Sequence, residues 1–331
     1  MIRACLFSLL VGMFVSAAYA QVLPNSRLAA PPSPPPGFLP PPLHPSGVTL
    51  ETRELGDGVY ALMSNRPFTD NAGFIVGSNE VLVIDSHFNG AMGRQIIEAV
   101  RRVSDLPIKY LLNTNAFGDH VFGNYVFSDD TIIVAHQSTI NALKISSVQG
   151  MSQTMARTVG GDISVFDGVE LRLPDVGFNG SWEIDLGGKV VQMYWFGKGM
   201  SPNDSVVFVP DVNVAWTANL IFGKGTIPWA RSGDILAYQE TLRNFSEALQ
   251  PATIVPGHGE IVSGDLVRSY RQYLAEIRVL SEQAVAAGIM IDDFVATAHV
   301  DPNYEIEPSL QGLMTGFHRW NLKVAFNEVS R

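Results

Sequence analysis

The chain has 331 residues, and its 32 acidic against 22 basic side chains give a formal net charge of −10. An acidic protein binds polyanions poorly, which argues against nucleic acid or an anionic membrane surface as a partner. The single cysteine, Cys5, lies close to the start of the chain. A disulfide framework and cysteine catalysis are therefore excluded from the rest of the sequence.

The first twenty residues have the pattern of an export signal. A positive charge at Arg3 is followed by an apolar run (residues 4–17) and a small-residue cleavage motif, Ala-Tyr-Ala, at residues 18–20. This pattern predicts a cleaved signal peptide over residues 1–20 and a periplasmic or secreted protein. No later segment approaches the ~18 apolar residues of a membrane span, so we expect no membrane insertion.

Residues 21–48 are crowded with proline, as in the stretch PPSPPPGFLPPPLHP. Proline-rich sequence favours extended polyproline II and cannot form a helix or a central strand. We expect a linker or an arm that lies on the protein surface, and a recognition ligand for another protein is the alternative.

The next segments alternate between strand and helix patterns. Short β-branched and aromatic runs at residues 59–63, 73–77 and 81–86 predict strands separated by polar turns. Apolar residues at helical spacing predict a helix over residues 92–103, and a strand resumes at Tyr110.

The second half repeats this alternation. Strands are expected at residues 182–184, 190–196, 205–210 and 214–219, a helix at 234–249, and a short strand at 253–257. Two similar halves with strands inside and helices outside predict an α/β sandwich of two sheets covered by helices. We assign this domain to residues 49–263.

Residues 264–331 are expected to be a C-terminal helical extension. Apolar side chains at helical spacing form two faces: Leu266, Tyr270, Tyr273, Leu274 and Ile277, and then Leu310, Leu313, Phe317, Trp320 and Val324. These helices pack on the core, or alternatively provide the surface of a homo-oligomer.

The most informative segment, NTNAFGDHVFGN at residues 113–124, directly follows a predicted strand. It resembles the metal-binding loop T-H-x-H-x-D-H of the metallo-β-lactamase superfamily, with Asn115 and Phe117 in place of the first two histidines. Further segments resemble that family in the same order, at residues 71–86, 196–204, 214–219 and 255–259. The resemblance spans residues 55–262 and implies the family's αββα fold.

The resemblance implies that the first of the family's two metal positions is empty. Its three histidine positions hold Asn115, Phe117 and Met200, which are not credible zinc ligands. Asn219 stands in place of the aspartate that bridges two metals in the family.

The second metal position retains its ligands, which the resemblance assigns to Asp119, His120 and His258. Asp85, at a strand end, matches the family's supporting carboxylate behind the ligands. Three protein ligands and an open position are typical of catalytic zinc, so we expect one zinc ion. The alternative is a metal-free cluster in which Asp119 and His120 cap a helix and satisfy each other's hydrogen bonds.

These residues predict an exported single-zinc hydrolase that acts on a small molecule with an ester, lactone or amide bond. Asp119 is expected to orient water, and Asn115 or Asn219 to donate to the developing oxyanion. One hypothesis is that the ammonium of Lys198 occupies the place of the missing cation. The alternative is that Lys198 is an exposed loop lysine.

Phe117 and Met200 are expected to make the cavity apolar. They belong equally well to the core. The competing hypothesis is a non-catalytic protein of the same fold that binds a small apolar ligand or a protein partner. His87, which follows Asp85 in the sequence, is a packing residue or a neighbour of the site.

Overall fold

The computed structural model describes residues 33–297 and 299–331. The predicted signal peptide and the first part of the predicted arm therefore lie outside the described residues. The described part of the arm packs on the folded body: Leu43 is buried, and its N–H donates to the carbonyl of Thr158 at 2.8 Å.

Seven strands form the first sheet in the order of the sequence. They are β1 (Leu50–Gly56), β2 (Val59–Ser64), β3 (Ala72–Val76), β4 (Val81–Ile84), β5 (Ile108–Asn113), β6 (Ile132–His136) and β7 (Val176–Phe178). Strands β1 to β4 pair antiparallel, and β4 to β7 pair parallel because longer crossovers connect them. The crossovers contain α1 (Gly90–Arg101), α2 (Gly118–Val121), α3 (Gln137–Lys144) and α4 (Val148–Met155), with short 3-10 turns at Asn124–Val126 and Ile163–Phe166.

Six strands form the second sheet in the order β13-β12-β11-β10-β9-β8. They are β8 (Ser181–Asp185), β9 (Val190–Tyr194), β10 (Val206–Val209), β11 (Val214–Trp216), β12 (Thr253–Val255) and β13 (Val262–Ser263). Strands β11 and β12 are parallel because α5 (Ile235–Ala248) lies between them in the chain, whereas the other neighbours are antiparallel.

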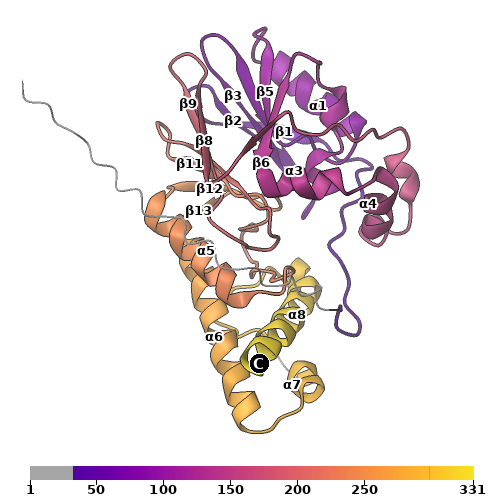
Figure 1. Cartoon of the computed structure of the whole chain (residues 1–331), viewed down its shortest axis with the longest axis vertical. Helices are drawn as coiled ribbons and strands as arrows, with labels where there is room; N and C mark the ends of the chain where they lie inside the picture. Colours follow the sequence, from indigo (N-terminus) through magenta and orange to yellow (C-terminus); the bar gives the residue numbers. More distant parts are fainter. Residues whose placement is uncertain (1–32, 298) are drawn as a thin grey trace, which may run out of the picture. The chain divides into compact units, whose positions relative to one another are not determined.

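The hydrophobic core has three parts, which define the layers. One part lies between the sheets and joins side chains such as Val59 and Trp216. A second packs α1 on the outer face of the first sheet, and a third packs α5 on the outer face of the second. Helices thus cover both outer faces, and the predicted αββα sandwich is confirmed (Figure 1).

Helix α1 begins two residues before its predicted start. Its N-cap is Asn89, whose side-chain oxygen accepts a hydrogen bond from the N–H of Met92 at 3.1 Å. Asparagine is a favoured N-cap because it satisfies a backbone donor that the first turn leaves free. Ile96 and Val100 then face the core, as their spacing predicts.

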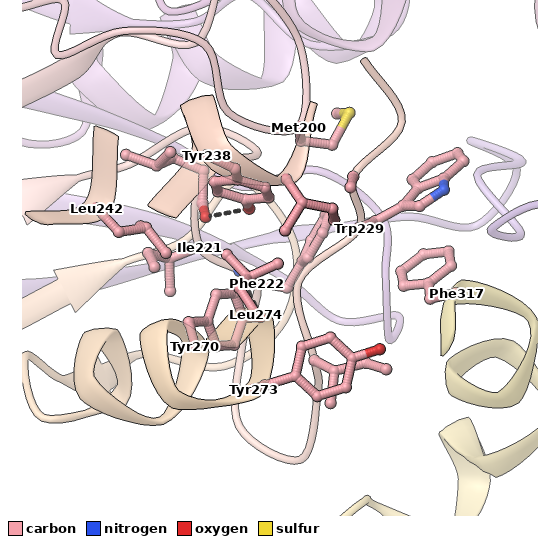
Figure 2. Packing of buried hydrophobic residues seen from close by; sticks show 14 of the residues in the cluster. Met200, Ile221, Phe222, Trp229, Tyr238, Leu242, Tyr270, Tyr273, Leu274 and Phe317 are labelled. Atoms are coloured by element: carbon pink, nitrogen blue, oxygen red, sulfur yellow. Dashed lines mark hydrogen bonds between the residues drawn. The ribbon is translucent and has the colours of Figure 1, made fainter. Parts of the chain in front are cut away.

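The C-terminal helices share a core with the second sheet. They are α6 (Leu266–Ala286), α7 (Ile291–Thr297) and α8 (Gln311–Val329), with a 3-10 turn at Pro308–Leu310. Tyr270, Tyr273, Leu274 and Phe317 from these helices are buried in this core (Figure 2). The predicted apolar faces are thus used largely within the chain, and a homo-oligomer stays a prediction. Among the described helices, none is long and apolar enough to cross a membrane.

Candidate metal centre

Four buried side chains meet at one edge of the sandwich. Asp70, Asp119, His120 and His258 each offer one ligand atom, and these atoms lie within 4.8 Å of one another. The sequence placed three of them together by resemblance. Asp70 is an addition that only the fold reveals.

Loops at strand ends position the four residues. Asp119 and His120 lie on α2, the first helix after β5, and His258 follows β12. Asp70 lies two residues before the start of β3 and pairs with His258 through an isolated antiparallel bridge. The N–H of Asn71 donates to the carbonyl of Gly257 at 2.7 Å, which fixes these two loops against each other.

Gly257 makes this close approach of the loops possible. A Cβ at this position would lie 2.8 Å from the carbonyl oxygen of Ala218 and 3.0 Å from Oδ1 of Asn219. Distances this short are not tolerated, so a glycine is required directly before His258.

Hydrogen bonds orient both histidines. Nδ1 of His120 donates to Oδ2 of Asp85 at 2.8 Å, and Nδ1 of His258 donates to the carbonyl of Phe68 at 2.8 Å. In each ring Nε2 is thereby directed at the cluster. Such support of a histidine from behind is typical of metal ligands, and it is the position that the resemblance gave to Asp85.

The backbone of Asp70 is also held by a hydrogen bond, from His87. Nδ1 of His87 accepts a hydrogen bond from the N–H of Phe88 at 2.9 Å, so its proton is on Nε2, which donates to the backbone carbonyl of Asp70 at 3.1 Å. Burial lowers the pKa of His87 to about 3 and keeps this ring neutral. Asp85 and His87 both have positive φ (58° and 65°), a strained conformation that often marks functional sites. Of the two interpretations of His87, the structure favours a neighbour of the site.

The four residues fit a cation because the ligand atoms of Asp70 and His120 have no hydrogen-bond partner among the described residues. Both carboxylate oxygens of Asp70 and Nε2 of His120 are buried without a hydrogen bond. Oδ1 of Asp70 lies 3.6 Å from Nε2 of His120 and 3.5 Å from Nε2 of His258, and Oδ2 of Asp119 lies 3.7 Å from the latter. Unpaired polar atoms are costly in a core, whereas a shared ion satisfies all of them at once.

The pKa shifts of the cluster residues also fit a bound cation. Burial and the neighbouring Asp119 raise the pKa of Asp70 well above its usual value. Burial also lowers the pKa of His258 to about 4, so its ring is neutral at pH 7 and supplies no charge to offset the carboxylates. Burial alone would lower the pKa of His120, but Asp85, Asp119 and Asp204 together outweigh it and raise this pKa to about 9. The donor set of two carboxylates and two imidazoles is one that zinc accepts.

The positions that replace the family's first-site histidines hold no ligand. Asn115 is fully buried: its Oδ1 accepts from the N–H of Phe117 at 2.9 Å, and its Nδ2 points at Asp204, 3.5 Å away. Its amide is thus engaged inside the protein, which makes it a poor oxyanion donor. Met200 is buried and Phe117 is half-buried.

The hypothesis that Lys198 replaces the missing cation is wrong. Its ammonium lies 3.9 Å from Oδ2 of Asp234, because the loop after β9 directs it toward the start of α5. The nearby positive charge belongs instead to Arg231. Its guanidinium lies 4.7 Å from the centre of the Phe117 ring and interacts electrostatically with Asp119. Burial lowers the pKa of Arg231, although the neighbouring carboxylates oppose this shift.

A cavity of about 310 Å³ opens beside the cluster, with Asp119 and His258 in its wall. Its wall also contains Phe117, Met200, Asn219, Trp229 and Arg231. Phe117 and Met200 therefore line the cavity as expected from the sequence, and Asn219 contributes to the same wall, with its Oδ1 buried and without a hydrogen-bond partner.

Sequence reasoning missed Asp70 and Arg231. Asp70 lies one residue before the segment that resembles the family, and no local motif marks it as a ligand. Arg231 lies in a loop with no recognisable motif, so its direction depends on tertiary contacts. The N–H of Ala230 donates to Oδ1 of Asn321 at 2.7 Å, and Nε1 of Trp320 donates to the carbonyl of Ala230 at 3.2 Å. Helix α8 thereby holds the Arg231 loop in place.

Comparison with known proteins agrees with the fold. A curated relative, "Metallo-beta-lactamase type 2" of Bacteroides fragilis, is 22% identical over 239 residues, which are 67% of this chain and 84% of the relative. Among solved structures, TMB-1 has a TM-score of 0.54 at 16% identity and covers 69% of this chain and 98% of its own. FIM-1 of Pseudomonas aeruginosa, solved in a mono-zinc form, has a TM-score of 0.52 at 16% identity and covers 69% of this chain and 96% of its own. The sequence model of the "Metallo-beta-lactamase superfamily" matches residues 65–258, more than half of the chain. The chain therefore belongs to the metallo-β-lactamase superfamily.

Proposed function

We propose that this protein is an exported hydrolase that uses one zinc ion, held by Asp70, Asp119, His120 and His258, to cleave an ester, lactone or amide. The observation that supports it best is the convergence of four buried ligand atoms within 4.8 Å, several of them without any other partner. A zinc ion bound there supplies a Lewis acid that polarises a carbonyl group and activates water. The mono-zinc form of FIM-1 offers a parallel for a single ion on this fold.

The protein's own side chains orient the ligands and accept the proton from water. Asp85 and the Phe68 carbonyl keep the two histidines oriented, so that both Nε2 atoms face the cluster. Asp119 lies in the cavity wall and is the carboxylate that can both contact the ion and accept a proton from water.

Two further groups in the cavity wall can stabilise the negative charge that develops on a substrate oxygen. Asn219 contributes to this wall and can donate through its Nδ2, and the guanidinium of Arg231 packs on aromatic rings, with no hydrogen bond or ion pair to another described residue. A well-aligned donor of this kind contributes ~3 kcal/mol to transition-state stabilisation. We assign this role to Arg231 and Asn219 rather than to Asn115.

Elemental analysis of protein purified without added metal tests the proposal. We expect one zinc per chain in the wild type, and hydrolysis of p-nitrophenyl acetate that is lost with chelator and restored by zinc. Lys198→Gln is the matched control, because this lysine lies outside the cavity wall, and it should retain both properties. A folded wild type that takes up no zinc would contradict the proposal.

A non-catalytic ligand-binding protein is the second candidate. The observation that favours it is the apolar, aromatic cavity wall together with the loss of all first-site histidines. Zinc uptake without turnover of any ester, lactone or amide would support this second function.

A further inference from the structure

The predicted arm forms part of the cavity wall. Pro34, Phe38, Pro40, Pro41 and Leu43 line the same cavity as Asp119 and His258. A segment far from the metal ligands in sequence therefore decides what shape of ligand fits beside them.

The arm is fixed in this position by specific contacts. Phe38 is only 7% exposed, and its ring centre lies 5.3 Å from that of Trp320 and 5.7 Å from that of Trp229. Its carbonyl accepts a hydrogen bond from Arg157 at 2.8 Å. The neighbouring prolines restrict the backbone before it docks, so ordering the arm costs little conformational entropy.

The wall built in this way is mostly apolar away from the metal centre. Phe38, Trp229 and Trp320 present aromatic side chains, and Met155 of α4 adds a flexible thioether. Asp119, His258, Asn219 and Arg231 supply the polar groups at the cluster or beside it. Thr154, Arg157 and Thr158 add polar groups on the side of α4, where Arg157 already bonds the Phe38 carbonyl. A cavity of about 310 Å³ lies at the lower end of small-molecule sites, so it suits one compact group.

We propose that the arm, through Phe38, is a specificity-determining wall that makes the cavity a compartment for a compact apolar acyl or aryl group of the substrate. This inference rests on the proposed function, because it names the substrate class of the same site. The scissile carbonyl of such a substrate lies at the metal centre, and its apolar group packs against Phe38, Trp229 and Trp320.

Chain-length series test this compartment. The probes are linear alkanoates from butanoate to decanoate, bound to chelator-treated protein by calorimetry, and p-nitrophenyl esters of the same acids, hydrolysed by the zinc-loaded protein. Burial of each methylene should tighten wild-type binding about fourfold until the compartment is full. Phe38→Ala should flatten this dependence. Phe38→Trp should shorten the longest chain that is accepted, which keeps the test meaningful if the smaller side chain weakens the fold.

Leu39→Ala is the matched control, since Leu39 is the next residue of the arm but is 71% exposed and outside the cavity wall. It should keep the wild-type dependence on chain length. An equal dependence of binding on chain length in all four proteins would overturn the proposal. Uniformly tighter binding of every probe to Phe38→Ala would also overturn it, because the arm would then only block the cavity. Chain-length-dependent binding of alkanoates without any ester hydrolysis would support the compartment and contradict the hydrolase function.

Discussion

Asp70→Asn separates a metal centre from a metal-free hydrogen-bonded cluster, because the two arrangements predict opposite effects in chelator. Asp70 is 1% exposed, both its carboxylate oxygens lack a hydrogen bond, and Asp119 lies beside it. Without metal, folding must either bury this charge unpaired or protonate it, and both cost free energy. Since an unsatisfied buried group costs about 1–3 kcal/mol, the isosteric amide should stabilise the metal-free protein by a similar amount.

With zinc present, the effect of Asp70→Asn should reverse. Loss of a charged ligand is expected to weaken zinc affinity by a factor on the order of 100 or more. A hundredfold loss removes about 2.7 kcal/mol of the stabilisation that a saturating ligand provides. The variant should therefore melt above the wild type in chelator and gain much less from zinc.

Melting curves in chelator and in zinc, together with competitive zinc titration, measure both effects. A shift of roughly 2–4 °C per kcal/mol is expected for a domain of this size. Asp204→Asn is the control: Asp204 is equally buried, but its Oδ2 accepts a hydrogen bond from the N–H of Ser201 at 2.7 Å, so its loss should not depend on zinc. If Asp70→Asn lowers the melting temperature equally in both buffers, the carboxylate serves a hydrogen-bonded cluster and the metal centre is refuted.

Three further outcomes follow from the site. His258→Ala should abolish high-affinity zinc binding in calorimetry, and it should lower the melting temperature in zinc but not in chelator. An equal drop in melting temperature in both buffers would exclude His258 as a metal ligand. Restoring the first site should not raise zinc content above one per chain until the nearby guanidinium is also removed, because two cations would repel each other there. The substitutions are Asn115→His, Phe117→His, Met200→His and Asn219→Asp, with Arg231→Gln as the added change, and elemental analysis would count the zinc. The side chain of Asn321 forms hydrogen bonds with Ala230, Pro228 and Tyr273 and so holds the Arg231 loop. Asn321→Ala should therefore destabilise the protein by about 2–3 kcal/mol in denaturant titrations and lower ester turnover. Unchanged turnover would show that the loop needs no such support.

The fold was largely predictable because buried strands and amphipathic helices leave regular apolar patterns. Such runs predict strands at residues 59–63 and 81–86; β2 contains the first, and β4 covers residues 81–84 of the second. β1 was missed because its sequence, LETRELG, is charged, and only Leu50 is buried in it. An edge strand needs few apolar residues, so pairing with β2 rather than its own pattern determines its structure.

The site was predictable only where a local motif records it. Asp119, His120 and His258 belong to segments that resemble the family. Asp70 joins them through a bridge to a residue 188 positions away, which no local pattern encodes. Lys198 and Arg231 illustrate the same limit: both are loop cations, but contacts with α5 direct one away from the cavity and contacts with α8 direct the other into its wall.

We propose one divalent ion rather than two because of the charges of the site. Asp70 and Asp119 provide two negative charges, and both histidines must be neutral to offer Nε2 to an ion, with Nδ1 of His120 donating to Asp85. One zinc ion balances the two carboxylate ligands. On the side of the lost histidines, Arg231 already supplies a fixed positive charge over Phe117, with Asp204 buried nearby as its electrostatic partner. A second metal ion would meet this guanidinium without the aspartate that the resemblance expects at Asn219, and this is why we propose a single ion.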